Sequence, residues 1–152
     1  ITSRLVGSEM CIRDRALAQA SAALEYVTNY VQEREQFGKP LVDFQAVQIK
    51  LADMLMKVEA ARLLIHKAAF NAQNGLPDIL ESSTAKCFSN EMSREVTTTA
   101  MQLMGGYGYN KEYGMERRVR DAFGWGIAGG TIDIQKINIA SAMIGRRFNQ
   151  RN

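Results

Sequence analysis

One stretch of this sequence limits the fold more than any other: residues 43–74, between Pro40 and Pro77, carry an apolar residue at every third or fourth position. The members of this series are Phe44, Val47, Leu51, Met54, Val58, Ala61, Ile65 and Ala68. This spacing places side chains on one face of an α-helix, whereas a half-buried strand alternates every second residue. The stretch therefore predicts a helix of about 45 Å, at roughly 1.5 Å per residue. Asp43 is expected as its N-cap and Gly75 as its stop.

Three further segments repeat the same period, over residues 16–34, 78–104 and 131–147. Their expected inward faces are Leu17, Ala20, Leu24, Val27 and Val31; then Ile79, Ala85, Phe88, Met92, Val96, Ala100 and Leu103; then Ile134, Ile137, Ala140 or Ser141, and Ile144. A short basic helix is expected near residues 113–123. No segment alternates every second residue, and the one Asn-Gly pair, Asn74-Gly75, lies between two helical segments and not between strand-like runs. The expected fold is all-α, an antiparallel arrangement like a four-helix bundle.

Composition excludes several classes of protein. With 152 residues, 46% of them hydrophobic, the chain suits one globular domain. Its net charge of +3 is small and dispersed, which argues against nucleic acid. Two cysteines allow at most one disulfide, no metal-ligand spacing is present, and no apolar run of about 18 residues could span a membrane. We expect a soluble cytoplasmic protein, or a mitochondrial matrix protein if the source is eukaryotic.

Glycine is distributed unevenly along the chain. Eight of the 12 glycines lie between Gly105 and Gly130, a stretch that links two of the expected helices. A purely structural bundle does not need so much glycine in a connection, whereas a backbone that approaches a bound ligand does. The glycine-rich stretch therefore predicts a ligand site.

Three motifs lie at the expected helix ends. They are Arg34-Glu35-Gln36-Phe37-Gly38-Lys39-Pro40 followed by Phe44-Gln45, then Gln102-Leu103-Met104-Gly105-Gly106-Tyr107-Gly108-Tyr109, and finally Ala128-Gly129-Gly130-Thr131. An arginine can hold phosphate oxygens, a phenylalanine can stack on an aromatic ring, and a Gly-Gly-Thr helix start can offer free amides to an anion. Each motif alone also has a structural explanation, as a helix-end cation, a turn plug or a cap.

Taken together and in this order, the motifs resemble those of the acyl-CoA dehydrogenase family, over about residues 16–148, which correspond to its C-terminal helical domain. The Arg120-Asp121 pair and the Gly-Gly-Thr-x-x-Ile-Gln helix start belong to the resemblance. It implies a fragment of a larger FAD-dependent enzyme that oxidises acyl-CoA to 2-enoyl-CoA and passes electrons to an electron-transfer flavoprotein. It also implies a homodimer or homotetramer, in which this domain mediates oligomerisation.

The resemblance also suggests roles for individual residues. Those expected to contact the adenosine diphosphate part of an FAD bound mainly by a neighbouring subunit, or its surroundings, are Arg34, Phe37, Gln45, Gln102, Gly105 and Gly106. Thr131 and Asp133 are expected to contact the chain's own flavin. Gly129 and Trp125 are expected near the substrate, with Trp125 either walling the cavity or simply packing.

The family's usual catalytic glutamate is missing, because its position is held by Gly129 and glycine cannot act as a base. Some branches take the base from the first helix of this domain, and counting back from Arg34 places that position at Ser8 and Glu9. Glu9 lies in a head, residues 1–15, that resembles a translated adapter sequence. We expect this head to be non-native or disordered, with the domain itself at residues 16–152, so the catalytic base stays unassigned.

Two alternatives to an acyl-CoA dehydrogenase follow from the missing glutamate. One is a partner subunit without a base in a heteromeric dehydrogenase, and the other is a related flavin-dependent oxidase or monooxygenase. In each case the 152-residue chain alone is expected to be inactive, because the domain that holds most of the flavin and CoA is not within it.

Overall fold

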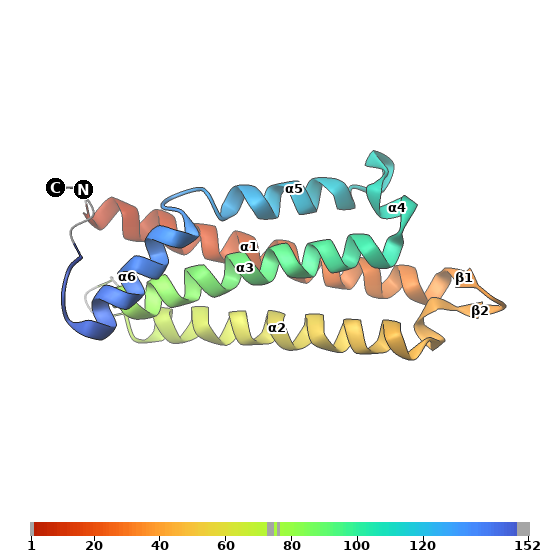
Figure 1. Cartoon of the computed structure of the whole chain (residues 1–152), viewed down its shortest axis with the longest axis horizontal. Coiled ribbons are helices and arrows are strands. Elements are labelled where there is room, and N and C mark those ends of the chain that lie inside the picture. Colours follow the sequence, from red (N-terminus) through yellow and green to blue (C-terminus); the bar gives the residue numbers. More distant parts are fainter. Residues whose placement is uncertain (1, 73–74, 76, 149–152) are drawn as a thin grey trace.

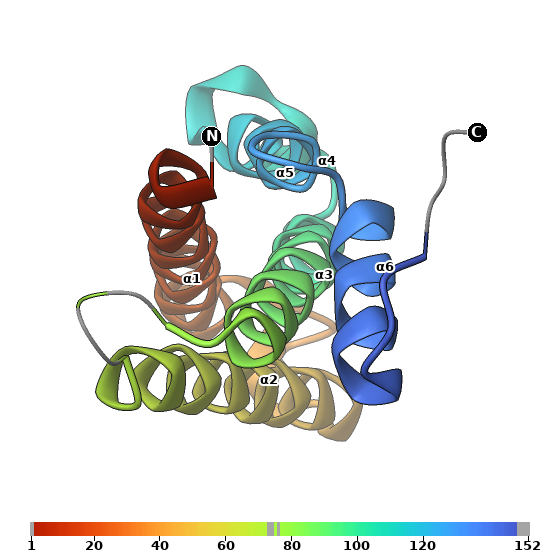
Figure 2. The ribbon, with the colours of Figure 1, turned by 90° about the vertical axis from the view of Figure 1, so that its left-hand side faces the viewer.

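The computed structural model describes residues 2–72, 75 and 77–148, and for residues 2–11 it describes the backbone only (Figure 1). Three long helices lie side by side and two shorter ones cover them. The helices of at least eight residues are α1 (Thr2–Glu33), α2 (Gln45–Phe70), α3 (Ile79–Met104), α5 (Met115–Trp125) and α6 (Ile132–Ile144). Helix α3 lies in the middle and packs against α1, α2, α5 and α6 (Figure 2). The all-α, bundle-like prediction is confirmed.

The connections between these helices are short. A hairpin of two-residue strands, β1 (Glu35–Gln36) and β2 (Lys39–Pro40), follows α1 and leads into the 3-10 turn η1 (Leu41–Asp43). After α3 come the single-turn helix α4 (Gly106–Tyr109) and the 3-10 turn η2 (Lys111–Tyr113). The hairpin was not predicted, since its strands are too short to show alternation.

The core confirms most of the expected inward faces. Between α1, α2 and α3 the buried apolar side chains are Leu17, Ala20, Ala23, Val27 and Val31; Met54, Val58, Ala61, Ile65 and Ala68; and Ala85, Met92, Val96, Ala100 and Met104. Many are alanines, which let the helix axes approach closely. The helical period of the sequence therefore identified the core of the three long helices.

Two expected faces are partly wrong. On α6, Ile134 and Ile144 are 48% and 64% exposed, and the buried residue is Gln135. Helix α6 is apolar around most of its surface, so its period could not show which side faces α3. Ile79, the first residue of α3, is also exposed.

Helix boundaries differ from the expected ones at several places. Helix α2 ends at Phe70 with Asn71 as its C-cap, so the expected stop Gly75 does not end it, and α6 ends at Ile144. Helix α1 begins at Thr2, so the break in the pattern before residue 16 does not mark the start of the helix. Helix α2 begins at Gln45 with Phe44 as its N-cap. Asp43, which was expected to cap α2, is the last residue of η1 and does not cap α2. Asp78 does cap α3, since its side chain accepts hydrogen bonds from the N–H groups of Leu80 and Glu81.

Within residues 2–72, 75 and 77–148, none of the helices has the length and apolar content needed to cross a membrane. The same residues contain no group of three or more His, Cys, Asp or Glu side chains that could hold a metal ion. Cys87 is a buried free thiol, as expected for a small core residue.

Candidate functional site

Four of the predicted residues meet in one groove at the hairpin end of the bundle. Arg34 follows α1, Gln102 lies on the last turn of α3, and Gly105 and Gly106 connect α3 to α4. The groove has a volume of about 490 Å³ and is also lined by Tyr30, Gln36, Leu41, Leu103, Met104, Tyr107 and Asn110. Its lining contains no carboxylate. We call it the end groove.

Aromatic rings hold Arg34 in place. Its guanidinium carbon lies 5.1 Å from the centroid of the Tyr107 ring, and Tyr107 packs edge-on against Tyr113 with centroids 5.1 Å apart. Arg34 makes no ion pair with any described residue, so its charge is available to a ligand. Burial raises the pKa of Tyr30 above its ordinary value of 10.0, although the nearby Arg34 acts in the opposite direction. Tyr30 therefore stays a neutral hydrogen-bonding group.

The turn at Gly105 needs glycine. Its φ of +59° and ψ of −135° are open to glycine and costly for other residues, and this conformation ends α3 and reverses the chain into α4. The Gly105 N–H donates to the Gln102 carbonyl over 3.2 Å. The backbone at the rim of the groove is thus tied to the helix turn that carries Gln102.

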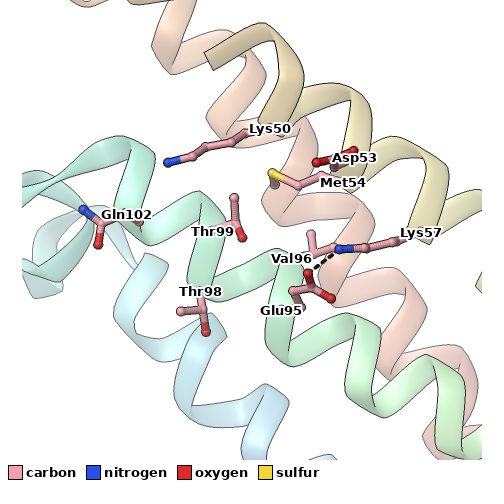
Figure 3. A pocket seen from close by; sticks show the side chains of 9 residues that line it. All are labelled: Lys50, Asp53, Met54, Lys57, Glu95, Val96, Thr98, Thr99 and Gln102. Atoms are coloured by element: carbon pink, nitrogen blue, oxygen red, sulfur yellow. Dashed lines mark hydrogen bonds and ion pairs between the residues drawn. The ribbon is translucent and has the colours of Figure 1, made fainter. Parts of the chain in front are cut away.

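A smaller hollow of about 300 Å³ lies between α2 and α3, and Gln102 lines both this hollow and the end groove (Figure 3). Lys57 and Glu95 form an ion pair across it. Lys50 extends toward the end of α3 that carries Gln102 and makes no ion pair with a described residue (Figure 3). Asp53 lines the same hollow as Lys50, so the unpaired cation without a carboxylate in the lining around it is Arg34 of the end groove, which favours an anionic ligand there.

Phe37 and Gln45 lie near the hairpin and do not line the end groove. Phe37 is 92% exposed and has a φ of +55°, the one positive φ found at a non-glycine residue in the described chain. Its only ring neighbour in the described part of the molecule is Phe44, edge-on at 6.3 Å. Gln45 is exposed at the start of α2.

The other predicted residues lie near the opposite end of α3. Gly129 and Gly130, which we call the glycine turn, precede α6, and Lys86 of α3 donates to both of their carbonyl groups. Thr131 is the N-cap of α6, and Asp133 is exposed in its first turn. Lys86 and Gln102 are 16 residues apart on α3 (102 − 86), about 24 Å at roughly 1.5 Å per residue. The predicted residues therefore do not gather in one place: four line the end groove, and Gly129, Thr131 and Asp133 lie at the start of α6.

Gly129 sits in a confined place. A Cβ added there would lie 2.7 Å from the Ile12 side chain, so a larger residue requires Ile12 to move. The side chains of the other candidate positions for a base, Ser8 and Glu9, lie outside the described residues. The described site therefore contains no carboxylate at the family's usual position.

Trp125 packs against α1. Its Nε1 donates to Gln19 Oε1 over 2.8 Å, and the Arg15 guanidinium lies 5.3 Å from its ring centroid. Neither hollow described above, nor the one beside the glycine turn, includes Trp125 in its lining. These contacts are those of a packing residue.

The sequence did not point to Lys86, which is 1% exposed. It lies on a face of α3 that is buried although it is polar, together with Ser82, Ser83, Ser89, Asn90 and Ser93. Polar residues at helical spacing normally mark a solvated face. The adjacent Cys87 donates to the Ile132 carbonyl, and burial raises the pKa of its thiol above the ordinary value of 9.0.

Comparison with known proteins places this chain in a family. A family model described as "Acyl-CoA dehydrogenase, C-terminal domain" matches residues 1–144, and the chain belongs to the acyl-CoA dehydrogenase family. The short-chain-specific acyl-CoA dehydrogenase of Megasphaera elsdenii is 41% identical over 140 residues, which are 92% of this chain and 37% of that protein. The chain spans about a third of the length of the curated relatives it matches.

Solved structures share the fold. A chain from a study of the electron-transferring flavoprotein of Acidaminococcus fermentans has a TM-score of 0.88 and 40% identity, covering 92% of this chain and 37% of that one. The glutaryl-coenzyme A dehydrogenase–glutaryl-CoA complex has a TM-score of 0.86 and 34% identity, covering 97% of this chain and 39% of that one.

Proposed function

We propose that this chain is the C-terminal, FAD-contacting and oligomerising part of a flavoprotein that oxidises acyl-CoA to 2-enoyl-CoA. The observation that carries the proposal is the end groove, which brings Arg34, Gln102, Gly105 and Gly106 together. The family membership supplies the reaction class. Bound FAD supplies the hydride acceptor for the desaturation, and an electron-transfer flavoprotein would receive the electrons.

The residues of the end groove fit the adenosine diphosphate part of FAD. A diphosphate needs cations and N–H donors, and the groove offers Arg34 with no carboxylate in its own lining. Lys50 lies in the adjoining hollow, which is also lined by Asp53 and Glu95. Phe37 follows Gln36, which lines the end groove, and its ring is exposed on a backbone with a positive φ. An exposed ring at such a position suits a surface that another molecule covers. Gln45 would contribute an amide at the start of α2. These residues would bind and orient the cofactor.

The two sites would contact different FAD molecules. They are separated by about 24 Å along α3, and the hairpin and α4, which contribute residues to the end groove, lie at the end of the molecule away from α6 (Figure 1). We assign Thr131 and Asp133, with Gly129, to the flavin and substrate of the same chain, and the end groove to a cofactor held by a neighbouring subunit. The complete site would then exist only in a homo-oligomer.

The outer face of α2 supports oligomerisation. Ile49, Met56, Leu63 and Phe70 recur at every seventh residue and are 55%, 68%, 67% and 91% exposed. A seven-residue spacing keeps side chains on nearly one line of a helix. We call this line the outer stripe. A helix that is apolar on both its inner and its outer face is expected to be covered on both.

The missing carboxylate at Gly129 favours a second candidate, a subunit that shares the cofactor but contributes no base. The missing carboxylate is also compatible with a third candidate, a related flavin-dependent oxidase or monooxygenase. A native glutamate near the position of Ser8 and Glu9 would support the dehydrogenase. We propose that residues 1–15 are foreign to the gene, and sequencing the source locus tests this. A continuous native reading frame through residues 1–15 would contradict it.

The proposal is tested with the full-length protein that carries this domain. Arg34→Ala removes the cation of the end groove, and a charged hydrogen bond is worth about 1.5–3 kcal/mol, or at least tenfold in affinity. The Kd for FAD, measured by flavin fluorescence, is expected to rise at least tenfold.

Arg117→Ala provides the matched control, because Arg117 is an exposed α5 residue paired with Asp121 and lies outside the end groove. It is expected to leave the Kd for FAD unchanged. Equal affinities in wild type and Arg34→Ala would refute the assignment of the end groove.

A further inference from the structure

Lys86 is an uncommon kind of lysine. It lies in α3, is 1% exposed, and directs its ammonium group at the glycine turn. Its Nζ donates to the Gly129 carbonyl and, over 2.9 Å, to the Gly130 carbonyl. Burying an ammonium group is costly unless hydrogen bonds compensate.

The two carbonyl contacts determine how the glycine turn presents its amides. In a trans peptide the C=O and the next N–H point in opposite directions. Because the carbonyls of Gly129 and Gly130 point at Lys86, the N–H groups of Gly130 and Thr131 point away from α3. Neither N–H donates to an acceptor within the described part of the chain.

The glycine turn needs such an anchor. Gly129 and Gly130 have φ values of +60° and +92°, which glycine adopts freely. Glycine also has many backbone conformations in the unfolded chain, so fixing these two residues costs conformational entropy. The neighbouring Cys87 donates to the Ile132 carbonyl over 3.5 Å. Two consecutive residues of α3 therefore hold three carbonyls at the entrance to α6, and both glycines line a hollow of about 690 Å³.

We propose that Lys86 is a positioning residue: it holds the glycine turn in the conformation that directs the Gly130 and Thr131 amides toward the flavin and substrate side of the site. This rests on the proposed function for its consequence in catalysis. Lys86 itself acts only through the glycine turn, because its ammonium group contacts the carbonyl side of the turn and the amides point to the other side.

The test uses the full-length protein with Lys86→Met, which keeps the length of the side chain and removes the donors. Hydrogen–deuterium exchange of a peptide covering residues 126–135 is expected to become at least tenfold faster. Exchange around Arg34 and the affinity for FAD are expected to stay unchanged, because the end groove lies about 24 Å away. Across a panel of acyl-CoA chain lengths, kcat is expected to fall at least tenfold at a nearly constant KM.

Lys136→Met provides the matched control, since Lys136 also joins α6 to α3, through an exposed ion pair with Glu91. It is expected to change none of these quantities. Lys86→Gln keeps two N–H donors without the charge, so it should recover part of the protection and remains informative if Lys86→Met does not fold.

Exchange of residues 126–135 that is unchanged in both Lys86 variants would overturn the proposal. Uniformly faster exchange over the whole protein would overturn it as well, because that result would mean that Lys86 stabilises the whole fold and not the glycine turn in particular. Failure of the proposed function is a different result, namely a wild-type protein that binds no FAD.

Discussion

Gly108 shows how a single missing methyl group positions the end groove. A Cβ at this residue would lie 2.7 Å from the Met101 carbonyl oxygen and 2.9 Å from the Met104 Cβ, so α4 could not pack on α3 as it does. Gly108→Ala is therefore expected to cost about 1–3 kcal/mol of unfolding free energy. Gly124→Ala, where nothing lies within 4 Å of the added Cβ, should be neutral or slightly stabilising. Urea unfolding measures both, and equal midpoints would contradict this account.

At the scale of an element, α3 depends on its N-cap. The Asp78 carboxylate accepts from Leu80 N over 2.8 Å and from Glu81 N over 3.2 Å, satisfying two of the unpaired amides of the first turn. Asp78→Ala is expected to lower the unfolding free energy by about 1 kcal/mol, and Asp43→Ala, which removes no cap, by less than about 0.5 kcal/mol. Thermal and urea unfolding provide the comparison. Similar losses in the two variants would show that capping is not the cause.

For the whole molecule, we propose that the outer stripe mediates the oligomer in which the two sites are completed. Replacing Met56 and Leu63 together by glutamate places two charges in the middle of this apolar line. If the stripe packs against another subunit, the full-length variant should have a lower mass by light scattering than wild type, because buried unpaired charges are costly. Lys111→Glu, at an exposed residue of η2, should keep the wild-type mass. An unchanged mass in the double variant would assign oligomerisation to another surface.

The sequence was sufficient for the five longer helices and for most of the core, but not for the hairpin of β1 and β2. Helical spacing identified the buried sides of α1, α2 and α3, and Asp78 was recognisable at the boundary of α3. It was insufficient for α6, where Ile134 is exposed and Gln135 is buried. A helix that is apolar on several sides has no preferred inner face until its neighbour is known.

Local pattern decides local structure, because the 3.6-residue period and the cap residues act within one helix. The prediction that the glycine-rich stretch binds a ligand also rests on local pattern, and it stays a prediction. The meeting of Arg34 with Gln102, 68 residues apart (102 − 34), and of Lys86 with Gly129, 43 residues apart, was decided by tertiary packing. Such contacts depend on how whole helices lie against one another, and no spacing along the chain encodes that geometry.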